Sequence, residues 1–144
     1  MRKLLPSALV ACALSFCSSI SFAHTGPEAG ARSYAQNYKD MVLVTCITNA
    51  YSSDKNVGKD AGSSISALRD WTEYDLDKSP DAVESLVNRY LSRDYFNPIV
   101  ESEIKGVKFD MLKCLDMYHS KELDTLTKQL VGHPNHTYEQ DNKK

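Results

Sequence analysis

This sequence of 144 residues lacks several features that would place it in a large class of proteins. After the N-terminal region, no segment approaches the ~20 apolar residues that a membrane-spanning helix needs, so we expect no membrane anchor. Lysine and arginine form no basic patch and the net charge is −2, so the chain has no electrostatic reason to bind nucleic acid. Low-complexity tracts and internal repeats are absent, which favours one small globular domain.

Catalytic motifs are also missing. The chain has no glycine-rich phosphate loop, no Gly-x-Ser-x-Gly elbow and no His-Glu-x-x-His metal motif. His133 and His136 have a spacing that metal ligands use, but a structural zinc site needs four ligands. The carboxylates between Asp70 and Asp77 are typical of a solvated helix face. We therefore predict a binding protein rather than an enzyme, with no cofactor and no metal.

The N-terminal region does carry a clear signal. Arg2 and Lys3 precede a mostly apolar stretch over residues 4–17, and small residues stand one and three positions before His24. This pattern predicts a cleaved secretory signal peptide over residues 1–23 and a mature single domain over residues 24–144, with a net charge of about −4. In a diderm bacterium, the mature chain would work in the periplasm.

Two cysteines remain after such processing, and they predict a disulfide. Cys46 and Cys114 would share an oxidising compartment, where two cysteines most often bridge. A bridge would close a loop of about 70 residues. The entropy that the unfolded chain loses by this closure would stabilise the fold by no more than about 4 kcal/mol. A catalytic thiol is the alternative, but His119 stands five positions after Cys114, which does not bring the side chains face to face on a helix. Cys12 lies in a local sequence like a lipoprotein cleavage site, so lipidation stays open as a separate alternative.

Apolar residues recur at steps of three and four along the mature chain, which predicts helices almost throughout. Alternation typical of strands is absent. We therefore predict an all-α fold, a small bundle of about four to five helices held by one disulfide. The first expected helix covers residues 33–51 with Ser33 as its cap, and the second covers residues 61–76 with Trp71 as a core anchor. The third begins at its cap Ser79 and ends at about residue 95, and the last covers residues 108–131. In the last of these we expect Leu112 and Leu115 on the apolar face, and a kink near His119 where Ser120 caps a second piece.

Three segments are expected to lie outside these helices. Residues 52–58 should separate the first helix from the second. Residues 97–107 should form a loop between two helices, and loops on a rigid scaffold carry recognition disproportionately. The alternative for this loop is a connector whose apolar residues pack back onto the bundle. The polar tail over residues 139–144 has nothing to bury and is expected to be disordered, as part of a flexible C-terminal tail.

Small residues gather in the second expected helix. Gly62, Ser63 and Ser66 would let another backbone approach closely, so they mark a candidate seam for a homodimer. The alternative is a frayed first turn of that helix.

Three separated blocks resemble one known family. They are residues 38–43 together with Cys46, residues 60–71, and residues 113–120 around Cys114. The resemblance is to the type VI secretion amidase immunity proteins, and specifically to those that neutralise the fourth class of amidase effector. It covers nearly the whole mature chain and rests on no catalytic signature.

The resemblance implies a periplasmic, all-helical, dimeric protein that binds a cognate peptidoglycan amidase of papain-like fold. Such amidases cut the γ-D-glutamyl–diaminopimelate bond of peptidoglycan peptides. A protruding loop of the immunity protein would enter the amidase cleft and block its Cys/His site. On this sequence the loop role falls on Asn97 to Gly106, with partner contacts from Ile99, Val100, Glu101, Ser102, Glu103, Ile104 and Lys105. The paired cysteines are consistent with the disulfide of that family.

Two other functions stay open beside this one. A periplasmic acid-stress chaperone can also be a small helical protein with one disulfide, and it would bind unfolded clients at low pH. An unrecognised hydrolase would degrade peptidoglycan itself. Within the inhibitor hypothesis, residues 52–59 are the next candidate for the inhibitory loop.

Overall fold

The computed structural model describes residues 26–143, apart from the side chains of Glu101 and Ser102. In this range a short 3-10 helix, η1 (Glu28–Ala31), precedes seven α-helices. They are α1 (Tyr34–Ala50), α2 (Lys55–Asp70), α3 (Ser79–Leu91), α4 (Pro98–Glu103), α5 (Asp110–Tyr118), α6 (Lys121–Leu130) and α7 (Tyr138–Asp141). Among the described residues, β structure is limited to one isolated bridge between Ser33 and Thr137. The predicted all-α class is confirmed, and α4 and α7 raise the number of helices above the expected four to five.

The N-terminal predictions fall outside this range. The expected signal peptide over residues 1–23, and Cys12 within it, are not among the described residues. Within the part of the chain that is described, none of the helices has the length and apolar character that crossing a membrane requires.

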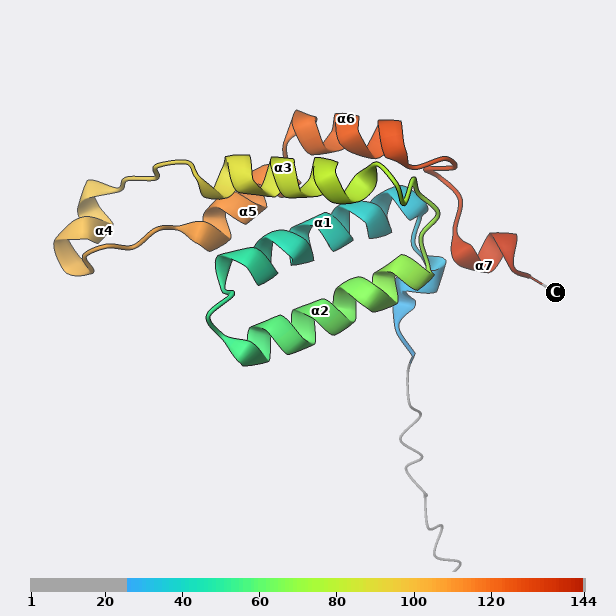
Figure 1. The fold of residues 1–144 in the computed structure, drawn as a ribbon, viewed down its shortest axis with the longest axis horizontal. Helices are drawn as coiled ribbons and strands as arrows, with labels where there is room; N and C mark the ends of the chain where they lie inside the picture. Colours follow the sequence, from blue (N-terminus) through green and yellow to red (C-terminus); the bar gives the residue numbers. More distant parts are fainter. Residues whose placement is uncertain (1–25, 144) are drawn as a thin grey trace, which may run out of the picture.

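Helix α1 is the centre of the bundle. It packs against α2 on one side and against α3, α5 and α6 on the other (Figure 1). Its fully buried side chains include Tyr38, Val42 and Cys46, which meet Val87 of α3, Met117 of α5 and Leu123 of α6 in one apolar core. Cys46 and Cys114 are joined by a disulfide with a Cα–Cα distance of 5.7 Å, so the predicted staple between the first and last long helical segments is confirmed.

Side-chain caps explain where several helices begin. The Ser33 hydroxyl accepts the Gln36 N–H, which confirms the predicted start of α1. The Ser120 hydroxyl accepts the Leu123 N–H, so the final helical segment divides near His119 as predicted. For α3 the prediction was wrong by one residue, because Lys78 is the cap and the Ser79 hydroxyl instead shares a 2.8 Å hydrogen bond with Tyr38.

Helix α2 is shifted from its predicted position at both ends. It begins at Lys55 rather than Ala61, because the Asp54 carboxylate accepts the N–H groups of Asn56 and Val57. A good cap is worth about 1 kcal/mol, enough to offset the roughly 1 kcal/mol that Gly58 costs within the helix. The helix ends at Asp70, and Trp71 is a half-buried C-terminal residue at the edge of the core rather than its anchor.

The C-terminal segment returns to the start of α1. The backbone N–H groups of Tyr34 and Ala35 donate to the carbonyl oxygens of His136 and Pro134. Thr137 and Gln140 form a reciprocal capping box that starts α7. The prediction of disorder after residue 138 is therefore wrong as far as Asp141.

Candidate functional site

The most prominent feature outside the bundle is an arm formed by residues 92–109, between the end of α3 and the start of α5. It projects from one end of the molecule and carries α4 at its tip (Figure 1). Residues 97–107, which were expected to form a loop between two helices, lie in this arm, but the prediction of a loop was wrong for Pro98–Glu103. A helix forms there because the Asn97 side chain accepts the N–H groups of Ile99 and Val100, and Pro98 occupies the first helical position.

Large apolar side chains of the arm face solvent. Ile99 is 75% exposed, Phe96 72% and Ile104 62%, whereas Val100 is half-buried. Packing back onto the bundle, the alternative for this segment, is therefore wrong for Ile99 and Ile104. A cluster of such residues on a small protein is typical of a surface that binds another protein.

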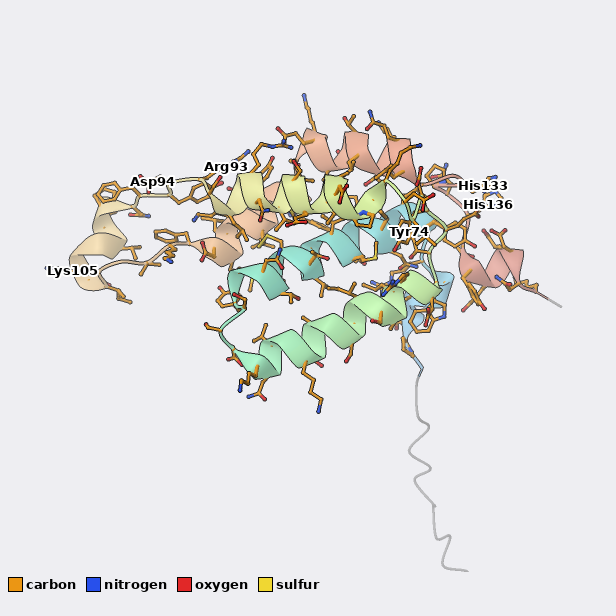
Figure 2. The ribbon with its side chains drawn as sticks, viewed as in Figure 1. Tyr74, Arg93, Asp94, Lys105, His133 and His136 are labelled. Carbon is orange, nitrogen blue, oxygen red and sulfur yellow. A yellow bond between two sulfur atoms is a disulfide. The ribbon has the colours of Figure 1, made fainter. Side chains whose placement is uncertain are left out.

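Charged groups also lie along the arm. Glu103 and Lys105 are exposed at the tip, and the guanidinium of Arg93 lies 3.5 Å from the centre of the Tyr90 ring near the base. Figure 2 shows Lys105 at the far end of the arm and Arg93 with Asp94 where the arm leaves α3. The arm thus carries both exposed apolar side chains and charged ones, a mixture that protein-binding surfaces also show.

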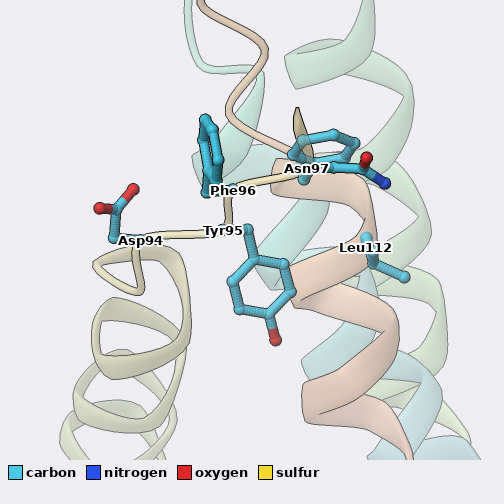
Figure 3. Close-up of a pocket in the computed structure, with 6 residues that line it drawn as sticks. Asp94, Tyr95, Phe96, Asn97 and Leu112 are labelled. Carbon is cyan, nitrogen blue, oxygen red and sulfur yellow. The ribbon is translucent and has the colours of Figure 1, made fainter. Parts of the chain in front are cut away.

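The base of the arm is built against α5. The Tyr95 hydroxyl donates a 2.6 Å hydrogen bond to the Asp116 carboxylate, and the Tyr95 ring lies between α3 and α5 (Figure 3). A hollow of about 340 Å³ is lined here by Asp94, Tyr95, Phe96, Asn97, Phe109 and Leu112. Phe109, the last arm residue, has a left-handed backbone (φ 56°), a conformation that costs a bulky residue about 1 kcal/mol.

Apolar exposure continues from the arm onto the body of the protein. Met111, Leu112 and Leu115 of α5 are 40–45% exposed, and Tyr51 beyond the end of α1 is exposed beside them. These side chains line a second hollow of about 520 Å³. The sequence placed Leu112 and Leu115 on a buried face, because periodicity does not distinguish a face that packs within the chain from one that faces solvent.

The small-residue surface of α2 faces open space. A Cβ added at Gly62 would meet no heavy atom within 4 Å, and Ser63 and Ser66 are exposed. The hydroxyls of Ser63 and Ser66 donate to carbonyl oxygens of their own helix, at Lys59 and Gly62. The seam for a homodimer stays a prediction. The alternative loop at 52–59 was wrong as a loop, because α2 begins at Lys55.

The two histidines of the C-terminal segment lie together but bind different carboxylates. Their ring centres are 5.0 Å apart, with His133 against Glu73 and His136 against Asp141. Among the described residues, no group of three or more His, Cys, Asp or Glu side chains could hold a metal ion. This cluster instead holds the C-terminal segment against the loop that follows α2.

Comparison with known proteins identifies a family. The family model of Tai4, described as type VI secretion system amidase immunity protein, matches residues 36–127, which include the whole arm. No curated protein sequence matches the chain.

Two solved structures share the fold. One comes from work on new type VI-secreted toxins and self-resistance proteins in Serratia marcescens. It is 32% identical, with a TM-score of 0.70, and the match covers 85% of this chain and 99% of that chain. The other belongs to the effector–immunity system Tae4/Tai4 from Salmonella typhimurium. It is 22% identical, with a TM-score of 0.62, and the match covers 73% of this chain and 96% of that chain.

Proposed function

This chain belongs to the family of type VI secretion system amidase immunity proteins, and we propose that it protects its cell by binding a cognate peptidoglycan amidase effector in the periplasm. In this proposal the arm, residues 92–109, enters the amidase cleft and blocks its Cys/His active site. The protein needs no catalytic group of its own for this role. The matching family model is described as an amidase immunity protein, which supports the choice of an amidase as the partner.

Exposure of Phe96, Ile99 and Ile104 is the observation that carries the proposal. These side chains do not belong to the core of the isolated protein. Their burial against a partner would remove apolar surface from water, which favours binding. Anchors of this kind, surrounded by polar groups, supply most of the free energy in protein interfaces. Because the arm is a narrow projection, it fits a concave surface better than a flat one.

Charge at the tip adds a second contribution. Glu103 is exposed beside the apolar residues and can accept hydrogen bonds from donors that line a hydrolase cleft. Hydrogen bonds to a carboxylate are stronger than those between neutral groups. Loss of one buried partner of this kind at the centre of an interface costs about 2–5 kcal/mol.

The scaffold behind the arm supports fast and tight binding. The Cys46–Cys114 disulfide joins α1 to α5, the helix that directly follows the arm. A scaffold held in place before binding loses less conformational entropy when it docks. The disulfide and the predicted signal peptide both favour an oxidising compartment, which supports the periplasm as the place of action.

Inhibition of the purified cognate amidase tests the proposal. The variant Ile99→Ser/Ile104→Ser should inhibit peptide cleavage about 30- to 700-fold more weakly, because two anchors of about 1–2 kcal/mol each are lost. Leu76→Ser is the matched control, since Leu76 is 61% exposed but lies before α3, at the end of the bundle remote from the arm. Deletion of Glu101 to Lys105 with a glycine closure should abolish inhibition while circular dichroism stays helical. Equal inhibition by parent and arm variants would show that the arm does not block the site.

A further inference from the structure

We infer that Lys113 is the positioning residue of the arm, because it joins both ends of the arm from a buried site and so sets the direction in which the tip is presented. This inference rests on the proposed function for its effect on inhibition. Its effect on the arm itself can be measured in the isolated protein.

The Lys113 ammonium group connects two helices at the points where the arm starts and ends. Its Nζ donates to the carbonyl oxygen of Leu91 at 3.1 Å and to the carboxylate of Asp110 at 2.9 Å. Leu91 is the last residue of α3 and Asp110 is the first residue of α5. One charged group therefore closes the base of the arm.

An aromatic contact extends this connection into the arm. The Nζ atom lies 5.9 Å from the centre of the Tyr95 ring, within the range of cation–π attraction. Tyr95 in turn donates its hydroxyl to Asp116, one turn further along α5. The first segment of the arm is thus held against α5 at two points, and the rest of the arm, with α4, projects from the bundle (Figure 1).

Burial shows that this lysine serves the arm and not the partner directly. The Lys113 side chain is only 5% exposed, and the Asp110 side chain is 22% exposed. Lysine is almost never this buried unless it is paired, because an ammonium group loses its hydration. A side chain so covered cannot reach an amidase surface, so any effect on inhibition must pass through the position of the arm.

Energetics argue for positioning over stabilisation. A buried ion pair gains little net stability, since desolvation offsets the attraction between its charges, and apolar residues of similar volume are often tolerated in place of both partners. Removal of Lys113 alone leaves the Asp110 carboxylate without its counterion, but that side chain is 22% exposed and keeps part of its hydration. An apolar residue cannot fix the orientation of the arm, because it makes no hydrogen bond to the end of α3 or the start of α5. Lys113→Met should therefore leave the bundle folded while the arm pivots more freely.

Amide hydrogen exchange of the free protein gives the first test. In Lys113→Met, exchange over residues 92–109 should be at least several-fold faster than in the parent, and should increase by a larger factor than exchange of the α1 amides, which follows the stability of the whole bundle. Lys128→Met is the control, because it removes the same charge from an exposed position on α6 and should change neither. Asp110→Ala provides a second variant, which frees the α5 end of the arm and should speed exchange in the same residues.

Affinity for the cognate amidase gives the second test. Lys113→Met should bind about 10- to 100-fold more weakly, because an arm that is no longer preorganised loses more entropy on docking. Unchanged arm exchange in both Lys113→Met and Asp110→Ala would overturn the inference, as would faster exchange with unchanged affinity. If the parent itself binds no amidase, the proposed function fails, whereas faster exchange in the variants would still support Lys113 as the residue that orders the arm.

Discussion

The hydroxyl of Tyr34 in α1 donates a 2.9 Å hydrogen bond to the carboxylate of Asp141 in α7, 107 positions later in the chain. Burial and this acceptor raise the pKa of Tyr34 to about 12. The same hydrogen bond, with a smaller contribution from His136, lowers the pKa of Asp141. The pair therefore stabilises the fold where Tyr34 is protonated and Asp141 is charged.

Alkaline unfolding should report this pair. Because the pKa of Tyr34 is raised above its unfolded value of about 10, its contribution is complete below that pH and is lost as the pH rises toward about 12. The free energy of unfolding from urea titrations should fall less steeply over this range in Tyr34→Phe than in the parent. Part of the slope should remain in the variant, since burial also raises the pKa of Tyr38, Tyr74 and Tyr118. Identical slopes for the two proteins would contradict the prediction.

Removal of the disulfide should destabilise the protein strongly. The bridge joins residues separated by 68 positions, and opening a loop of this size costs about 2–4 kcal/mol of unfolding free energy. Cys46→Ala/Cys114→Ala should therefore unfold at a clearly lower urea concentration than the oxidised parent. Mass spectrometry of the parent, unfolded without reductant and treated with an alkylating agent, should find neither cysteine modified. Alkylation of both would disprove the bridge.

The small-residue surface of α2 gives a prediction for oligomeric state. Light scattering at micromolar concentration should give twice the mass of the mature chain if Gly62, Ser63 and Ser66 form the proposed dimer seam. Gly62→Leu should then give a folded monomer, because a side chain there meets no atom of its own chain. An intact dimer in Gly62→Leu would exclude this seam, and a monomeric parent at all accessible concentrations would exclude the dimer.

The N-terminus of α2 depends on one carboxylate. Asp54→Ala removes the acceptor for two backbone N–H groups and should lower the free energy of unfolding by about 1 kcal/mol. Ser53→Ala, in the same exposed turn, is the control and should change stability little. Equal urea midpoints for the parent and Asp54→Ala would show that the first turn of α2 contributes nothing to the folded state.

Comparison of sequence and structure shows where local patterns are sufficient. The starts of α1 and α6 could be predicted, because Ser33 and Ser120 each act as a cap within a few residues of the groups they bind. The start of α2 was missed because residues 52–58 were expected to separate two helices, whereas the Asp54 cap starts α2 inside that segment. Helix α4 was missed for another reason: it is too short to show a period, and only Asn97 and Pro98 mark it.

The position of the candidate site in the sequence could be predicted, but the contacts that hold it in place could not. Mixed apolar and charged residues between two strong helices indicated residues 97–107. The base of the arm could not be predicted, because the partners of Lys113 include a backbone carbonyl of α3, and no side-chain pattern records such a contact. Exposure of Leu112 and Leu115 was hidden for a similar reason, since it depends on which helices the fold places against α5.

Helices η1 and α7 pack together at the end of the molecule opposite α4 (Figure 1), and Gly26 and Lys143, the first and last described residues, stand two positions from these helices in the sequence. An affinity tag, a fluorophore or a tether to a sensor surface attached at either position would leave the tip unobstructed. Immobilised in this way, the protein would present its arm to solution, and a soluble amidase could approach it as freely as it approaches the untethered chain.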